Sequence, residues 1–455
     1  MQQNRRAAVE AYFFTGGCCR KKGYNIHHMQ PTVVTLQNGL RVVVVDTKSF
    51  PTATAILLVG AGSRYENEIN NGIAHFFEHM AFKGSKKYKT SYEISATIEG
   101  LGGYFNAFTS KDHTGYWLKA TTAHLDTMVD VLSDMVLHPL LLEEEIQREK
   151  GVIIEEMNMY EDTPQRKVGD LYEQLLYQGN PLGYDIIGSK KTIRDVTRDT
   201  FTNYIDQLYY PNNAVMVVAG GLAGAKKSEQ SVLHLIEDKF GSWKQKKSEF
   251  SYTPVEEMQT QPNKIIKQKK SEQAHFSIGF RTFKTTDPRR YTLSVLTTIL
   301  GGGMSSRLFM QVRERRGLCY YISTGRESYR DVGYMVTQAG VPIDKDKIKD
   351  AVSVILDEHH KVACGHITDD ELARAKEIIK GHVLLSLEDS QHVAMWYGSS
   401  LLLDQELRSP AQVIKKIDAV TKEDVILLAS SLFQASQLNF ALIGPFDDID
   451  VDLKI

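Results

Sequence analysis

The feature that most constrains the fold is a weak internal repeat with a spacing of about 220 residues. The segment Val-Thr-Arg-Asp-Thr-Phe starts at residue 196, and Val-Thr-Lys-Glu-Asp-Val starts at residue 420. Each is followed by a strand-like segment that ends in glycine, at Gly220 and at Gly444. Residues 145–150 match 371–376 in the same order along the chain. Coincidence among common helix and strand patterns is the alternative, but the shared order favours a duplicated unit.

Strands and helices mix within each half of the chain. Segments rich in β-branched or aromatic residues predict strands at 40–45, 54–59, 115–120, 215–220, 275–281, 333–338 and 438–443. Helical periodicity predicts helices at 70–82, 90–101, 122–137, 142–160, 291–300, 344–359 and 369–387. The pattern predicts an α+β fold of two homologous halves, each a mainly antiparallel sheet with helices packed on one face.

Local composition predicts where the halves begin and end. A basic tail at 1–30 precedes a first half at 31–243, and a second half occupies 264–455. The polar segment 244–263 contains Pro254 and Pro262 and has the composition of a linker. The tail is basic but lacks the serines of a transit peptide and the apolar core of a secretory signal, so a frayed tail is the favoured interpretation.

Overall composition excludes several classes of protein. The 54 basic and 56 acidic side chains leave a net charge of −2, without the basic excess of a general nucleic-acid binder. No stretch approaches the ~18 apolar residues of a membrane helix. The four cysteines are too few for a disulfide framework and form no C-x-x-C pair, which indicates a reducing compartment. We therefore expect no nucleic-acid partner and no membrane span.

Residues 75–79 read His-Phe-Phe-Glu-His and carry the strongest functional signal. On a helix, His75 and His79 share a face and can reach one metal ion, while Glu78 projects beside them as a candidate base for a metal-bound water. This is the reverse of the H-E-x-x-H zinc-protease motif. A catalytic zinc takes three protein ligands, and the predicted helix 142–160 offers Glu149 and Glu156, two turns apart on one face.

This combination resembles the pitrilysin-type inverzincin zinc peptidases, and most closely the subgroup of mitochondrial processing peptidase and its single-chain bacterial relatives. Further similar stretches are 72–74, 80–84, 102–107 and 181–183. The resemblance implies one Zn²⁺ per chain bound by His75, His79 and Glu156, with Glu78 as general base. It also implies a supporting role for Glu149 and two similar halves that enclose a chamber.

The second half has no counterpart of the metal motif, because Ala375 and His382 occupy the positions equivalent to Glu149 and Glu156. The resemblance instead implies that Arg313 and Tyr320 reach across the chamber toward the substrate near the zinc. It implies that substrate adds as a strand beside Phe105, Asn106 and Ala107. The lysines at 267, 269 and 270 are interpreted as a solvated face.

The function predicted from these residues is zinc-dependent endopeptidase activity on peptides or unfolded protein segments. Two alternatives stay open: a mitochondrial-type presequence-processing subunit that needs a non-catalytic partner, and a non-enzymatic structural homologue. We expect a homodimer, with a heterodimer containing a homologous non-catalytic subunit as the alternative. The expected location is the cytoplasm of a bacterial-type cell, with the mitochondrial matrix as the alternative.

Overall fold

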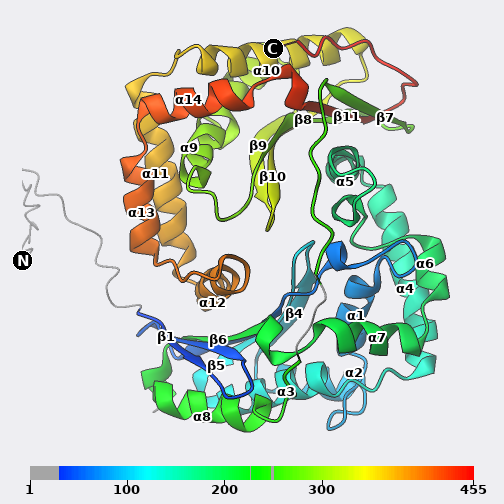
Figure 1. Cartoon of the computed structure of the whole chain (residues 1–455), viewed down its shortest axis with the longest axis vertical. Helices are drawn as coiled ribbons and strands as arrows, with labels where there is room; N and C mark the ends of the chain where they lie inside the picture. The colour runs from blue at the N-terminus through cyan, green and yellow to red at the C-terminus, as the bar shows by residue number, and fades with distance from the viewer. Residues whose placement is uncertain (1–29, 226, 247–250, 455) are drawn as a thin grey trace, which may run out of the picture.

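The computed structural model describes residues 30–225, 227–246 and 251–454. The predicted tail therefore lies outside the described residues except for Gln30, and so do residues 247–250 of the predicted linker. Residues 244–246 and 251–262 of that linker contain no helix or strand, Asn263 begins strand β7 (Asn263–Gln268), and the segment 251–262 runs from one half of the molecule to the other (Figure 1).

The first half of the chain forms a six-stranded sheet in the order β1-β2-β6-β3-β5-β4. Strands β2 and β6 are parallel, and all other neighbours in the sheet are antiparallel. The strands are β1 Thr32–Thr35, β2 Arg41–Asp46, β3 Thr52–Val59, β4 Tyr104–Thr109, β5 Thr114–Thr121 and β6 Ala214–Gly220. Strand β4 lies at one edge of this sheet, with one strand neighbour only among the described residues.

The second half repeats this topology in a five-stranded sheet of order β7-β11-β8-β10-β9. Again one pair, β7 and β11, is parallel and the rest are antiparallel. The strands are β7 Asn263–Gln268, β8 Ala274–Phe283, β9 Tyr321–Ser328, β10 Val332–Val341 and β11 Leu438–Gly444. Since β7, β11, β8, β10 and β9 take the places of β2, β6, β3, β5 and β4, the predicted fold of two homologous halves is confirmed.

Helices surround both sheets, and the predicted ones appear within a few residues of their expected bounds. Those of the first half are α1 Ile73–Ala81, α2 Ser91–Gly100, α3 Leu125–Leu137, α4 Glu143–Glu161, α5 Pro164–Leu176, α6 Lys190–Asp195, α7 Arg198–Leu208 and α8 Glu229–Phe240. Those of the second are α9 Arg290–Gly301, α10 Lys345–Ala363, α11 Asp369–Ser386, α12 Ser390–Ser399, α13 Pro410–Ala419, α14 Lys422–Leu432 and the π-helices η6 Phe309–Glu314 and η7 Ser400–Asp404. No helix in the described part of the chain is long and apolar enough to cross a membrane.

Each sheet is covered on its second face by a helix from the other half of the chain. The central strands β6 and β11 are buried along their whole length, so both faces of each sheet need cover. Helix α12 of the second half packs on β3 and β6, and helix α5 of the first half packs on β8 and β11 (Figure 1). The exchange buries Tyr397 of α12 among the apolar side chains of the first sheet and Tyr172 of α5 against those of the second. The two halves therefore share their cores.

A buried ion-pair cluster adds a polar connection between the halves. Arg64 is 1% exposed, and its guanidinium lies 2.9 Å from Asp112 of the first half and 2.8 Å from Asp331 of the second. The same guanidinium stacks over the ring of Tyr252 in the connecting segment, at 3.8 Å from its centre. Removing one partner of a buried pair typically costs about 3–5 kcal/mol, because the other charge stays buried.

The C-terminal end of α4 is held by the second half. Lys267 on β7 lies 2.6 Å from the Glu161 carboxylate, and Lys269 lies 3.2 Å from Asp162 and donates to the Glu161 carbonyl oxygen. Cations are favoured at this end of a helix, where carbonyl oxygens are unpaired. The interpretation of Lys267 and Lys269 as a solvated face is therefore wrong, since both bind a helix end.

Gly398 tests the exchange of helices, because at this residue α12 packs directly against side chains of the first sheet. A Cβ at this position would lie 2.6 Å from Leu58 Cδ1 and 3.0 Å from Val217 Cγ2. We expect Gly398→Val to lower the free energy of unfolding by about 1–3 kcal/mol through overpacking. The matched control is Gly381→Val on α11, where an added Cβ meets nothing within 4 Å. Equal denaturation midpoints for the two variants would contradict the close packing of α12.

Candidate metal centre

Helix α1, which carries the His75–His79 motif, is positioned by a buried carboxylate at its N-terminus. Glu66 is 3% exposed and accepts hydrogen bonds from the backbone N–H groups of Gly72 and Ala74, both at 2.8 Å. Burial raises the pKa of Glu66 to about 8, while these hydrogen bonds act in the opposite direction. Gly72 has a φ of +97°, and a Cβ there would lie 2.8 Å from the Ile187 carbonyl oxygen. Only glycine fits this entry to the helix without strain.

Three predicted ligands meet where α1 packs against α4. One donor atom from each of His75, His79 and Glu156 lies within 4.8 Å of the other two. The Glu156 Oε2 atom is 3.7 Å from His75 Nε2 and 3.6 Å from His79 Nε2. Donors around a tetrahedral zinc ion with bonds of ~2.1 Å are about 3.4 Å apart. Two imidazole nitrogens and one carboxylate oxygen at these separations fit zinc with a fourth position left open.

Glu149 orients one of the two histidines. Its Oε1 atom lies 2.9 Å from His79 Nδ1, and its Oε2 atom lies 2.6 Å from Lys83 Nζ. Burial raises the pKa of Glu149, but the hydrogen bonds from His79 and Lys83 outweigh it and hold that pKa below its ordinary value. An ionised acceptor at Nδ1 leaves Nε2 unprotonated and directed at Glu156, which is how metal-binding histidines are held.

The protonation state of His75 and the hydrogen bond to Glu156 also suit the binding of a cation. Burial and, to a smaller extent, the charge of the neighbouring His79 lower the pKa of His75 to about 4, so the imidazole is neutral at pH 7. A neutral imidazole is the form that binds metal. The second oxygen of Glu156 accepts a hydrogen bond from the Tyr160 hydroxyl at 2.5 Å, and the Arg166 guanidinium covers the Tyr160 ring at 3.7 Å.

Glu78 faces a cavity next to the metal ligands. Its Oε2 atom accepts a hydrogen bond from Thr109 Oγ1 at 2.6 Å, which ties the helix to the end of β4. Burial raises the pKa of Glu78, while Thr109 and His79 counteract part of that rise. His75, Glu78 and Thr109 line a cavity of about 240 Å³. A carboxylate whose pKa is raised toward neutrality beside an open site is suited to accept and return a proton.

The predicted substrate-binding residues lie on edge strand β4. Phe105 and Ala107 face the helices of the first half, and the ring of Phe105 lies 5.5 Å from that of Phe82. Asn106 is exposed, and its side-chain oxygen accepts from the Ala107 backbone N–H at 2.8 Å. Because Thr109 on the same strand binds Glu78, the edge leads directly to the candidate base.

Among the described residues, Arg313 and Tyr320 make no hydrogen bond or ion pair with the candidate metal ligands of their own chain. Both lie in the second half, where the Arg313 guanidinium sits 4.6 Å from the ring centre of Phe309 and 5.9 Å from that of Tyr320. Neither residue lines the cavity at His75 and Glu78. The Tyr320 side chain is 72% exposed, so it is free to contact another molecule.

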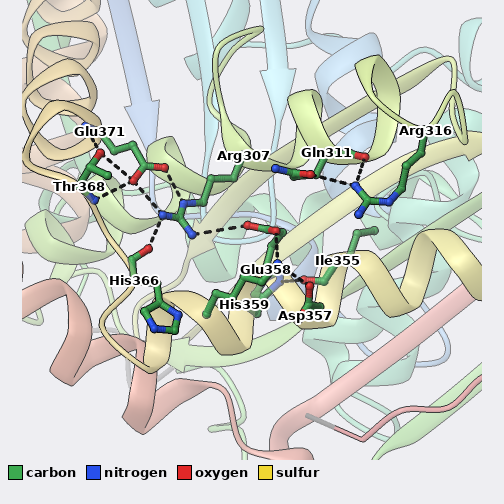
Figure 2. A network of polar contacts seen from close by, with 11 residues as sticks. Arg307, Gln311, Arg316, Ile355, Asp357, Glu358, His359, His366, Thr368 and Glu371 are labelled. Atoms are coloured by element: carbon green, nitrogen blue, oxygen red, sulfur yellow. Dashed lines mark hydrogen bonds and ion pairs between the residues drawn. The ribbon is translucent and has the colours of Figure 1, made fainter.

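The helix that carries Arg313 is fixed by the polar network in Figure 2. Arg307, just before η6, binds both oxygens of Glu371 at 2.7 and 2.8 Å and approaches Glu358 at 3.5 Å. Beyond η6, Arg316 donates to the Gln311 side chain at 2.9 Å. The position of Arg313 is thus set by contacts to α10 and α11, within the second half.

Sequence reasoning missed several residues of this centre. Glu66, Thr109, Tyr160 and Lys83 all contact a ligand, the candidate base or the helix that bears them. Tyr160 had a readable signal, because it lies one turn after Glu156 on the same helix. No signal in the sequence pointed to Thr109 or Glu66, because the contacts of both depend on how separate segments are brought together by the fold.

Two family models match consecutive parts of the chain. Residues 41–190 match the family model described as insulinase (peptidase family M16), and residues 195–379 match the model described as the peptidase M16 inactive domain. The chain is 35% identical over 411 residues to the uncharacterized zinc protease YmxG of Bacillus subtilis (strain 168), which covers 90% of this chain and 97% of that protein.

Two further similarities extend over most of the chain. The beta subunit of the mitochondrial-processing peptidase of Mus musculus is 31% identical over 462 residues, which covers 97% of this chain and 91% of the relative. The crystal structure of a protease from Helicobacter pylori superimposes with a TM-score of 0.85 at 25% identity, covering 91% of this chain and 99% of that one.

Neighbouring glutamates on α4 provide a test of the metal site. We expect Glu156→Gln to lose bound metal, because the third ligand is gone, whereas Glu155→Gln should retain it, because Glu155 is exposed and bonded only to Asn158 among the described residues. The measurement is the zinc content per chain of each variant after dialysis, determined by atomic absorption. Equal zinc content in the two variants would contradict the ligand assignment.

The candidate base is tested separately from the ligands. Glu78→Gln should keep about one zinc per chain and lose peptide hydrolysis, since glutamine cannot accept the proton but all three ligands remain. His79→Ala should lose both zinc and hydrolysis. Near wild-type hydrolysis by Glu78→Gln would show that Glu78 is not the base.

Proposed function

The chain belongs to peptidase family M16, and from this premise we propose that it is a zinc-dependent endopeptidase that holds one zinc ion through His75, His79 and Glu156. The observation that carries the proposal is the convergence of these three donors beside Glu78, next to a cavity that His75 and Glu78 line. We also propose the boundaries 31–243 for the catalytic half, 244–263 for the linker and 264–455 for the metal-free half.

The proposed chemistry assigns one task to each side chain of the site. Zinc bound there would act as a Lewis acid toward the scissile carbonyl and lower the pKa of a water molecule. Thr109 holds one oxygen of Glu78, so the other oxygen, Oε1, is the atom that takes the proton and later passes it to the leaving amine. Glu149 keeps His79 in the required tautomer throughout the cycle.

The proposed substrate is an extended, unfolded segment that adds to the edge of β4. Strand addition provides affinity through main-chain hydrogen bonds, and it requires a segment without secondary structure of its own. The edge is open on one side of β4, beside Phe105, Asn106 and Ala107, and it leads to Thr109 and Glu78. A substrate bound there would have its backbone aligned with the metal centre.

We propose further that Arg313 and Tyr320 act on the metal centre of a second copy of the chain. Both lie away from the ligands of their own chain, and Tyr320 is exposed. In a symmetric dimer the second half of one copy would face the first half of the other and enclose a chamber. There the Tyr320 hydroxyl would donate to the developing oxyanion, and Arg313 would bind a peptide carbonyl. The proposed location of this homodimer is the cytoplasm of a bacterial-type cell.

A second candidate function is favoured by one comparison. The similarity to the beta subunit of mitochondrial-processing peptidase supports a presequence-processing subunit in the mitochondrial matrix, which would need a homologous, non-catalytic partner. The two candidates differ in whether the purified chain cleaves peptides alone. A purely structural role is disfavoured, because His75, Glu78, His79, Glu149 and Glu156 are all in position.

Complementation between two inactive variants tests the dimer. Glu78→Gln and Tyr320→Phe should each be impaired alone, the second by about 10²–10³ in kcat. Co-expressed, they should recover roughly a quarter of wild-type activity, because random pairing makes half of the dimers mixed and each mixed dimer has one complete site. Co-expression of Glu78→Gln with His79→Ala is the control and should recover nothing. Inactive mixed dimers, isolated with two affinity tags, would contradict action across the dimer.

The state of the substrate tests strand addition. The enzyme should cleave unfolded peptides of roughly ten to thirty residues, an estimate from the length of strand that must add to β4. A tightly folded small domain should resist internal cleavage, while the same chain after reduction and denaturation should be cut. Mass spectrometry of both digests measures the difference, and equal internal cleavage would contradict the proposed chamber.

A further inference from the structure

A cavity of about 340 Å³ lies in the second half, apart from the metal centre. It is enclosed by α9, the end of β9, α11, α13 and the segment from α12 into η7, which lie together in Figure 1. None of its lining residues comes from α1 or α4, and none belongs to the first half. The function proposed above does not use this cavity.

The charged groups that line this cavity are unbalanced. Three arginines, Arg290, Arg326 and Arg408, face a single carboxylate, Asp404, so the lining carries two positive charges in excess. Asp404 pairs with Arg408 and lies 3.7 Å from Arg290, and its other oxygen is occupied by Thr285 at 2.9 Å. The side chain of Asp404 is 2% exposed and that of Arg290 is 13% exposed, so water has little access to this pair.

The three guanidinium groups retain unused capacity to bind an anion. The Nε atoms of Arg290 and Arg408 are buried without a hydrogen-bond partner among the described residues. Arg326 is exposed; its guanidinium donates a hydrogen bond to Ser294 at 3.4 Å, and the charge of the adjacent Glu327 acts on it. Burial lowers the pKa of Arg408, and the charge of Arg290 lowers it further. An anion would relieve this repulsion, and guanidinium groups match carboxylate and phosphate oxygens in pairs.

The other walls of the cavity are apolar and aromatic. Trp396 of α12 is fixed by a hydrogen bond from its indole N–H to the Arg408 carbonyl oxygen at 2.7 Å. Ile379 and Val383 of α11 form another wall. Ligand sites typically combine such apolar walls with a few polar groups that fix the orientation of the ligand.

The backbone beside the cavity is irregular in a way that is common at functional sites. The segment η7 is a π-helix, and Gln405, which follows it, has a φ of +55° although it is not glycine. Carbonyl oxygens of η7 accept hydrogen bonds from Arg41 of the first half at 2.8 Å and from Arg330 at 3.3 Å. Short π-helical segments of this kind cost stability and are often kept where a ligand binds.

We propose that this cavity binds a small organic anion, with the carboxylate or phosphate group on Arg290, Arg326 and Arg408 and the apolar body against Trp396 and α11. The site is independent of the metal centre and of its chemistry. Because η7 and α12 contact both halves, a ligand bound here stabilises the folded chain as a whole.

Calorimetric titration of the full chain tests this site, with phenyl phosphate and 3-phenylpropionate as probes and with inorganic phosphate and phenol as controls. Both probes should bind more tightly than either control, because only they supply charge and an apolar body together. The relative affinity of the two probes identifies phosphate or carboxylate as the preferred group. Quenching of Trp396 fluorescence should accompany binding and be absent in Trp396→Phe. Phosphate binding as tightly as phenyl phosphate would overturn the proposal.

Matched arginine variants separate this cavity from general anion attraction. Arg326→Gln should weaken probe binding about tenfold or more, since a hydrogen bond to a charged group is lost without breaking a buried ion pair. Arg198→Gln, an exposed position on α7 in the first half, should bind like the wild type. A probe held only at the metal centre would bind Arg326→Gln and wild type equally. That result, or no binding by either probe, would overturn the proposal.

Discussion

Neither sheet of this chain can cover both of its faces with helices of its own half. Strands β6 and β11 are buried throughout, so each sheet presents an apolar surface on the side opposite its own helices. Helices α12 and α5 cover these surfaces reciprocally. Burial of apolar area is the main favourable contribution to folding, so the halves must fold together rather than one after the other. This explains why the second half persists without any metal ligands.

The two halves of the chain share their scaffold but differ in their candidate functional residues. The two sheets share their strand order, yet among the described residues the candidate metal ligands lie in the first half alone, on α1 and α4 beside the end of β4. At the corresponding positions of α11, Ala375 and His382 replace Glu149 and Glu156. The same architecture thus provides a candidate metal site in one half. In the other it provides the arginine-lined cavity, the exposed Tyr320 and the helix that carries Arg313.

The sequence was informative where an interaction is local. His75 and His79 are one helical turn apart, and Glu149 and Glu156 are two turns apart, so periodicity alone places each pair on one face. It was uninformative where contacts join distant segments. The predicted helices did not include α5 or α12, and no local pattern shows which sheet each of them covers. For the same reason Lys267 and Lys269 resembled solvated lysines, and the spacing of Arg313 and Tyr320 did not show that both lie outside the cavity at His75 and Glu78.

Helix α4 links the metal centre mechanically to the arrangement of the halves. It carries Glu156, and its last turn forms ion pairs with Lys267 and Lys269 of the second half. After a short turn the chain continues into α5, which packs on the second sheet. Because a helix is stiff along its axis, a displacement of one end moves the other end as well. Any hinge motion that separates the halves would therefore displace Glu156, the carboxylate among the three candidate ligands. The separation between Glu156 and the two histidines therefore depends on how closely the two halves are held together.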